Sequence, residues 1–358
     1  MSRIRSRWAE IDLSAIGENV DTIRSWLPVG SGLIAVVKDN AYGHGAVEVG
    51  RVALARGAIG LAVAKLEEVS ELKGLCPPPQ ILLLGGLLPE QAAEVAELGC
   101  SVVCHSRELI AAMAAAAPVN RRIPIHLKVN TGMNCLGCSP EVAPDLARQI
   151  ANSPRLRLAG VLTHFAAPAS DKKFTRSQFA AFSKLLAGLP VEAGLRHACN
   201  STAARLYPEM ALDAVRCGIA IYGDAGSSEL RPALSLHSRI IQVIEVEAGA
   251  TVGSLRDWRA TSRARIATAA IGYGDGVHRM RSNRGQVAIN GRLAPLIGGV
   301  GMDQIGIDIS DLPKVKPGDV VTLIGEGITA EQVAEWSETI EREVLTSAGN
   351  RVERVYKM

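Results

Sequence analysis

Eight short apolar segments, separated by stretches of helical periodicity, occupy the first two-thirds of the chain and constrain its fold more than any other feature. They lie at 33–39, 59–64, 79–86, 100–106, 124–130, 158–165, 196–202 and 215–223. The stretch 13–27 shows the helical pattern, because Ile16, Val20, Ile23 and Leu27 recur at the spacing of one helix face. Strands alternating with helices are typical of parallel βα units, and eight units in about 220 residues predict a (β/α)8 TIM barrel. A doubly wound sheet is the alternative, although eight evenly spaced units are unusual for it.

The pattern changes after the barrel to alternating strands separated by turns. These apolar runs lie at 238–246, 264–276, 286–299, 304–310 and 319–326. Asn290-Gly291 predicts a two-residue hairpin turn, and Thr329 predicts the start of a helix. We therefore predict an α/β chain with a barrel over 8–230 and a mostly β domain over 234–358. Residues 1–7 are expected to associate with the second domain.

Composition and charge exclude several classes of protein. Lys and Arg number 39 and Asp and Glu 36, a net charge of +3 without a basic run, so we expect no nucleic-acid partner and no membrane-surface role. No apolar stretch reaches the roughly 18 residues of a membrane span, and the first residues lack the apolar region of a secretory signal. The odd number of cysteines, seven, argues against a disulfide framework, so we predict a cytoplasmic protein.

Two cysteines, Cys135 and Cys138, form the only closely spaced pair. A CxxC pair without a second pair or nearby histidine ligands is weak evidence for zinc or redox chemistry. We predict no metal site.

Reactive groups of a TIM barrel gather at the carboxyl ends of its strands. The polar residues at those positions are Lys38, Asp39, Asn40, His105, Lys128, Asn130, His164, Asn200, Ser201 and Arg216. Lys38 follows a wholly apolar run, so its amine is expected to face the barrel mouth. Partial desolvation lowers the pKa of a lysine and suits it to Schiff-base chemistry with an aldehyde. On this pattern alone, a solvated lysine at a strand end is an equal alternative.

The segment AVVKDNAYGHG around Lys38 resembles the motif of the bacterial alanine racemases, in which a lysine carries pyridoxal phosphate (PLP). The similarity covers essentially the whole chain, in the order KVNTGM, THF, HACNST, AVRCGIAIYG, IGYGDG, GMDQ and RVERVY. The resemblance implies a barrel followed by a β domain. It also implies a PLP-dependent isomerase that interconverts L- and D-alanine, or a related small amino acid, through an aldimine at Lys38.

The same resemblance assigns roles to individual residues. Lys38 is then the catalytic residue and holds the cofactor, while Arg216 faces the pyridine nitrogen, His164 supports this arginine and Asn200 lies near the ring. The phosphate group is expected to meet Tyr42, Ser201, Gly218, Ile219 and Tyr356. Tyr273 and Met302 are expected to reach the substrate site of a partner subunit, because the family forms head-to-tail homodimers that share their sites.

Several positions depart from the family pattern, and two of them bear on the chemistry. Ser254, in the segment VGSLRDWRA, stands where the family has a catalytic tyrosine. Cys135 occupies the place of an arginine that contacts the substrate carboxylate, and Lys128 has a counterpart that is often carbamylated. A serine hydroxyl cannot act as a base near neutral pH without assistance. If the racemase activity is retained, the second proton would come from Asp257, Cys135 or a water held by Ser254.

These departures leave alternatives to racemisation open. One is a PLP-dependent lyase or aldolase that acts on β-hydroxy amino acids by chemistry on one face of Cα. Another is a non-catalytic PLP-binding protein, although the β domain is unexpected for that role.

Overall fold

The chain forms two compact units. In the computed structural model, residues 5–223, 226–254, 256–325, 327–349 and 351–358 are described. The barrel unit comprises Ala15–Ala41 and Gly45–Arg231. The β unit comprises Met1–Ser14, Tyr42–His44 and Pro232–Met358. Each unit is built around its own apolar core.

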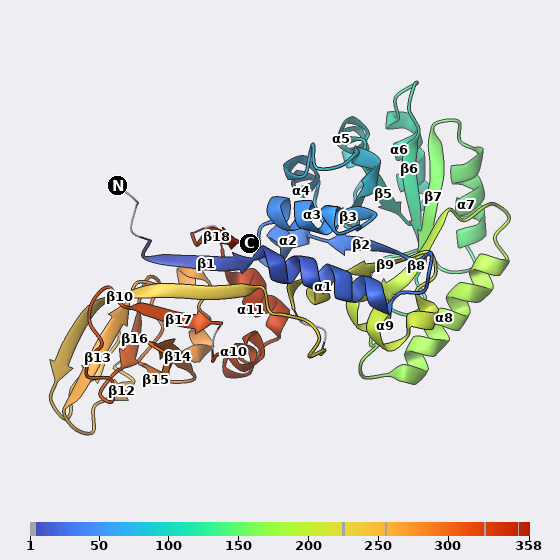
Figure 1. The fold of residues 1–358 in the computed structure, drawn as a ribbon. Coiled ribbons are helices and arrows are strands. Elements are labelled where there is room, and N and C mark those ends of the chain that lie inside the picture. The colour runs from blue at the N-terminus through green and yellow to red at the C-terminus, as the bar shows by residue number, and fades with distance from the viewer. Residues whose placement is uncertain (1–4, 224–225, 255, 326, 350) are drawn as a thin grey trace. The chain divides into compact units, whose positions relative to one another are not determined.

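The barrel unit contains a closed barrel of eight parallel strands in the order β2 to β9, which confirms the predicted TIM barrel (Figure 1). The strands are β2 (Gly32–Val36), β3 (Gly60–Val63), β4 (Ile81–Leu83), β5 (Ser101–Cys104), β6 (Ile123–Lys128), β7 (Leu156–Leu162), β8 (Leu195–Asn200) and β9 (Ala214–Cys217). Most of their residues are buried, because helices cover the outer face and side chains fill the inside.

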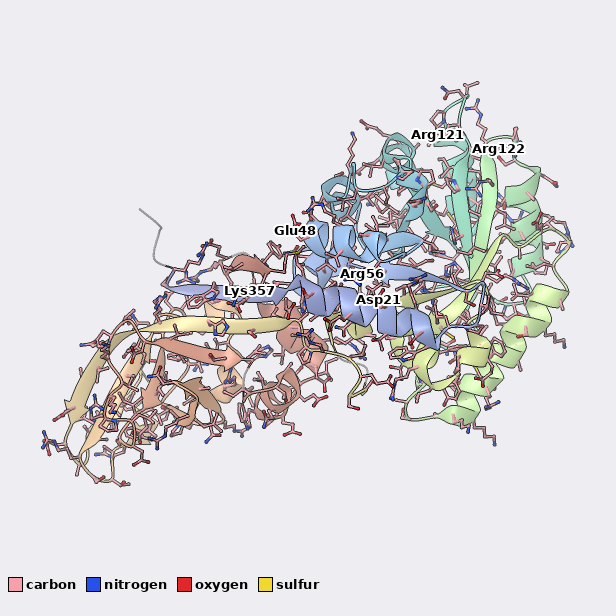
Figure 2. All side chains as sticks on the ribbon, viewed as in Figure 1. Asp21, Glu48, Arg56, Arg121, Arg122 and Lys357 are labelled. Carbon is pink, nitrogen blue, oxygen red and sulfur yellow. The ribbon has the colours of Figure 1, made fainter. Side chains whose placement is uncertain are left out.

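Helices connect successive barrel strands. They are α1 (Leu13–Trp26), which leads into β2, α2 (Lys38–Tyr42), α3 (Ala46–Ala55), α4 (Leu66–Glu71), α5 (Ala92–Leu98), α6 (Arg107–Ala116), α7 (Ala143–Asn152), α8 (Lys172–Ala187) and α9 (Ser201–Leu206). Ile16, Val20 and Ile23 of α1 are fully buried, as their spacing predicts. Asp21 of the same helix pairs with Arg56 at 2.5 Å, which ties α1 to the end of α3 (Figure 2).

The last predicted strand, 215–223, is shorter in the structure. β9 ends at Cys217, and Ile219–Tyr222 form a 3-10 turn. The backbone leaves the strand at Gly218, whose amide donates to the Ser201 hydroxyl at 3.1 Å. Because the Gly218 amide bonds to the Ser201 hydroxyl, it is not available for a hydrogen bond to a neighbouring barrel strand.

The β unit contains an eight-stranded sheet in the order β13-β16-β15-β14-β17-β10-β1-β18. Its strands are β1 (Arg7–Asp12), β10 (Leu234–Val246), β13 (Ala264–Ala269), β14 (Gln286–Ile289), β15 (Arg292–Ile297), β16 (Ile305–Asp308), β17 (Val320–Ile324) and β18 (Glu353–Lys357). A separate hairpin joins β11 (Thr251–Val252) to β12 (Trp258–Arg259), and two helices, α10 (Ala330–Ser337) and α11 (Glu341–Ser347), precede β18.

The structure confirms the predicted hairpin turn and the predicted helix start in the β unit. Asn290 and Gly291 both have positive φ, 52° and 74°, and connect β14 to β15 as a two-residue hairpin turn. Thr329 caps α10, because its hydroxyl accepts a hydrogen bond from the Gln332 amide. The helix α11 was not predicted, since its seven residues are too few for a clear periodicity.

The start of the chain differs from the predicted boundary at residue 8. β1 pairs antiparallel with β10 and parallel with β18, so residues through Ser14 belong to the β unit rather than to the barrel. Alternate side chains of β1 are buried, and Ile11 is fully buried. The alternation of a half-buried strand, within RWAEID, was the signal for this placement.

We expect Ile11→Ala to lower the free energy of unfolding by about 2–5 kcal/mol, because it removes a buried aliphatic side chain. The matched substitution Ile241→Ala, at a residue of β10 that is 47% exposed, should change it by no more than about 0.5 kcal/mol. Urea unfolding curves of the two variants provide the test, and equal midpoints would contradict the placement of β1.

Candidate functional site

Lys38, the predicted catalytic residue, and several predicted cofactor-binding residues of the barrel unit lie at the carboxyl end of its strands. Lys38 follows β2, His164 follows β7, and Asn200 ends β8, while Arg216 lies within β9. The positive charges of Lys38 and Arg216 both act on His164. The structure therefore brings these groups together at one mouth of the barrel.

Arg216 is the most connected side chain at this mouth, and it is only 4% exposed. Its Nη2 donates to the carbonyl oxygens of Thr163 at 2.7 Å and Ala198 at 3.1 Å, and its Nη1 donates to that of His197 at 3.0 Å. Burial lowers the pKa of Arg216 to about 10, so the guanidinium still carries its proton at neutral pH. It acts as a fixed hydrogen-bond donor.

Two histidines contact the guanidinium through their Nδ1 atoms, His197 at 2.8 Å and His164 at 3.2 Å. A guanidinium can only donate, so Nδ1 of His197 must accept and its Nε2 carries the proton. That Nε2 lies 2.9 Å from Nδ1 of His126 and donates to it. The contacts form a directed chain, Arg216 to His197 to His126, inside the barrel.

The same surroundings keep the histidines neutral. Burial, then the charge of Arg216, lowers the pKa of His164 to about 3, and burial also lowers the pKa of His126 to about 3. His197 is fully buried, and its pKa lies well below the ordinary value. Near pH 7 none of these rings is an imidazolium that could act as a general acid.

Asn200 and Ser201 organise the end of β8. The Asn200 amide nitrogen lies 3.4 Å from His164 Nε2, and its side-chain oxygen accepts from the Ala203 amide, which caps α9. The buried Ser201 hydroxyl accepts from the amides of Gly218 at 3.1 Å and Ala220 at 3.3 Å. The Ile219 amide between them donates to no acceptor within the described part of the chain.

Lys38 is followed by a left-handed turn of the backbone. Asp39, Asn40, Ala41 and Tyr42 all have φ between 52° and 54°. This conformation costs L-residues about 1–2 kcal/mol each and does not persist without support from its surroundings. The Ala41 amide donates to the Val37 carbonyl at 2.8 Å, and the Gly45 amide donates to the Asn40 carbonyl at 2.9 Å.

A second lysine, Lys128, ends β6 beside the same group of charges. Burial is the main cause that lowers its pKa, opposed by Cys135 and assisted by the charges of Arg216 and Lys38. Cys135 is exposed, whereas Cys138 is buried. Among the described residues no group of three His, Cys, Asp or Glu side chains could hold a metal ion.

The sequence did not identify three residues that contact Arg216, His197 or His164. His197 and His126 lay in predicted strands but were not singled out, and a histidine inside an apolar strand was the available signal. Gln178 of α8 is 1% exposed, and its amide nitrogen donates to the His164 carbonyl at 3.1 Å. No sequence signal identified Gln178, because its partner is a backbone carbonyl on the loop before its helix.

The remaining predicted residues belong to the β unit. Tyr42 and Tyr356 lie there, and so do Tyr273 and Met302, which are 42% and 54% exposed. The Tyr273 amide donates to the Gly301 carbonyl at 2.9 Å, so Tyr273 and Met302 lie on adjacent loops. Ser254 is exposed in the loop between β11 and β12.

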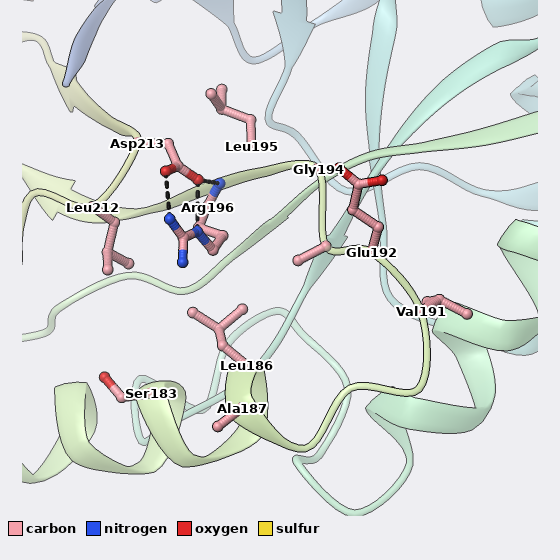
Figure 3. Close-up of a pocket in the computed structure, with 11 residues that line it drawn as sticks. Ser183, Leu186, Ala187, Val191, Glu192, Gly194, Leu195, Arg196, Leu212 and Asp213 are labelled. Carbon is pink, nitrogen blue, oxygen red and sulfur yellow. Dashed lines mark hydrogen bonds and ion pairs between the residues drawn. The ribbon is translucent and has the colours of Figure 1, made fainter. Parts of the chain in front are cut away.

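A pocket at the opposite end of the barrel is separate from these residues. Its lining includes Leu195, Arg196, Leu212 and Asp213, at the amino ends of β8 and β9 (Figure 3). Arg196 and Asp213 form a two-pronged ion pair at 2.7 Å and satisfy each other. TIM barrels place their chemistry at the carboxyl ends of the strands, so this pocket is not the candidate active site.

The fold and the mouth define a barrel enzyme built around a strand-end lysine and a buried arginine. Residues 11–226 match the family model "Alanine racemase, N-terminal domain", and residues 233–356 match "Alanine racemase, C-terminal domain". The chain therefore belongs to the alanine racemase family, which confirms the predicted family and class, a PLP-dependent isomerase.

Individual relatives cover nearly the whole chain. The alanine racemase of Desulforamulus reducens is 39% identical over 365 residues, spanning 98% of both chains. The crystal structure of alanine racemase from Bacillus anthracis with bound L-Ala-P has a TM-score of 0.92 at 34% identity, covering 100% of this chain and 96% of that one. The alanine racemase from Bartonella henselae, solved with covalently bound pyridoxal phosphate, has a TM-score of 0.90 at 31% identity. The match covers 99% of this chain and 100% of that one.

The donor set at the mouth fits PLP. Lys38 supplies a primary amine for the aldehyde. The four hydrogens on the terminal nitrogens of Arg216 face protein acceptors, whereas its Nε–H has no acceptor within the described residues and can face a ring nitrogen. The Ile219 amide, between two amides that bond to Ser201, has no acceptor among the described residues.

The neutral histidines predict a specific pH dependence of stability. Between about pH 6.5 and pH 3, the unfolded chain binds a proton at His126 that the folded chain does not, so stability falls as the pH falls. We expect His126→Asn, which keeps an acceptor for His197, to reduce this slope by about 1.4 kcal/mol per pH unit. Urea unfolding at pH 4.5, 5.5 and 7 measures the slope, and an unchanged slope would contradict a neutral His126.

Proposed function

We propose that this protein interconverts L- and D-alanine with PLP held by Lys38. The observation that carries the proposal is the arrangement of Lys38 and a buried, proton-retaining Arg216 at one barrel mouth, in a chain of the alanine racemase family. Tyr42, Ser201, Gly218, Ile219 and Tyr356 are the proposed phosphate ligands. This assignment follows the resemblance in sequence, and the donors at Ser201 and Ile219 support it.

Arg216 and Lys38 have different roles in the proposed reaction. Bound PLP supplies a conjugated ring that stabilises negative charge at Cα of the amino acid. Arg216 keeps its own proton near neutral pH, so it would hold the ring nitrogen by a hydrogen bond without protonating it. Lys38 Nζ takes and returns the proton on one face.

The opposite face of Cα needs a second proton donor. Ser254 takes the place of a tyrosine in the proposed alignment, and a hydroxyl of this kind needs help from another group. Three groups are candidates: Asp257, a water held by Ser254, and Cys135. Ser254, Asp257 and Cys135 are all exposed on their units, so each side chain is accessible to a substrate or a solvent molecule.

Incubation of the PLP-loaded protein with L-alanine in D2O tests the function. We expect loss of the Cα proton signal in NMR together with D-alanine that rises to equal the L form, since enantiomers have equal free energy. Lys38→Ala should slow both by at least about 100-fold, and the exposed control Lys173→Ala should not. D-alanine formation at the wild-type rate in the Lys38 variant would contradict the proposal.

The exposed Ser254 favours a second candidate function. Without a tyrosine, the chain would act on one face of Cα, and the natural reaction is retro-aldol cleavage of a β-hydroxy amino acid. The D2O experiment separates the two, because exchange with retained L configuration and aldehyde release from a β-hydroxy substrate would favour the lyase. PLP binding without exchange would favour a non-catalytic PLP-binding protein.

We also propose a homodimer that shares its sites. The exposure of Tyr273 and Met302 on adjacent loops supports a role for them in a partner's site. The cytoplasmic location is part of the same proposal, and the seven free cysteines support it. No helix of the described residues is long and apolar enough to cross a membrane.

Mixing two inactive variants tests the shared site. Lys38→Ala and Tyr273→Ala chains, co-refolded in equal amounts, should regain about a quarter of wild-type racemisation, because half of the dimers then hold one intact site. A mixture as inactive as its two components, with dimers present by light scattering, would contradict sharing.

A further inference from the structure

The residue after Lys38 is held by a carboxylate from another βα unit. Glu68, on α4, is 8% exposed, and its Oε1 accepts a hydrogen bond from the backbone amide of Asp39. Its Oε2 accepts from the amides of Ala64 at 2.8 Å and Lys65 at 3.0 Å. One buried side chain therefore joins the loop after β3 to the turn after β2.

We propose that Glu68 is a positioning residue for Lys38. It touches neither substrate nor cofactor in this role, and it acts through the Asp39 amide. This inference rests on the proposed function of Lys38 as the cofactor-binding residue.

The left-handed turn needs such a contact at its first residue. Later in the turn, Asn40 is held at both of its oxygens, because the side chain accepts from the Ala46 amide at 2.9 Å and the carbonyl accepts from Gly45. At Asp39, the Glu68 carboxylate is the acceptor for the amide. The Asp39 side chain adds little, since its 3.8 Å pair with Lys65 joins two exposed groups.

A carboxylate suits this place better than an amide. Three N–H groups converge on Glu68, and only an ionised carboxylate offers acceptors on both oxygens. A glutamine would turn an NH2 donor toward at least one of these amides. The turn would lose its anchor at Asp39 or the loop would lose its cap at Ala64 and Lys65, and the direction of Lys38 would be less defined.

Glu68→Gln and the matched control Glu67→Gln test the proposal. Glu67 is exposed on the same turn of α4, so both variants lose one negative charge from the same helix. We expect Glu68→Gln to weaken PLP binding by about tenfold or more in an absorbance titration and to speed hydrogen exchange in residues 37–42. Glu67→Gln should match the wild type in both measurements. Equal behaviour of the two variants would overturn the proposal.

A measurement on the unmodified protein covers the case in which Glu68→Gln fails to fold. The Asp39 amide should exchange as slowly as the Val37 amide, which donates to the Ala62 carbonyl at 2.8 Å within the barrel. An Asp39 amide that exchanges at the rate of an open loop would overturn the proposal. Neither readout requires racemase activity, so a failure of the proposed function leaves this test intact.

Discussion

The buried guanidinium of Arg216 is the interaction on which the barrel mouth depends. Among the described residues it has no carboxylate partner, and its charge is met by three carbonyls and two neutral histidine nitrogens. Its short hydrogen bonds fix the carbonyl of Thr163, just after β7, two carbonyls of β8, and the rings of His164 and His197. A carboxylate in place of these carbonyls and histidines would neutralise the charge of Arg216. Because the described partners of Arg216 are uncharged, the barrel mouth stays positive, which suits a phosphorylated cofactor and a carboxylate substrate.

Lys38 depends on a different kind of constraint. Its own strand is ordinary, but the four residues that follow adopt a backbone conformation that L-residues avoid. Strain of this kind persists only where neighbouring contacts over-determine it. Here Glu68, the Asn40 side chain and the Val37 carbonyl supply those contacts. The site therefore combines an arginine held on a strand with a lysine that a strained turn directly follows.

The fold was predictable because barrel strands carry strong local signals. Eight apolar runs and the Asn290-Gly291 turn correspond to the observed strands and hairpin. The same signals placed Lys38, His164 and Asn200 at the ends of strands, while their roles stay predictions. The contacts of Glu68 and Gln178 were not predictable, since each side chain bonds a backbone group on another segment, 29 and 14 residues away in sequence. The placement of β1 was also missed, because its partners lie more than 200 residues away.

We propose that Lys38 alone holds the cofactor, and chemical trapping tests this assignment most directly. Reduction of the PLP-loaded protein with borohydride fixes the cofactor on the amine that binds it, and peptide mass spectrometry then locates the label. We expect a phosphopyridoxyl group on Lys38 and none on Lys128, although both amines lie near Arg216. A label on Lys128, or one spread over surface lysines, would contradict the assignment of the cofactor to Lys38.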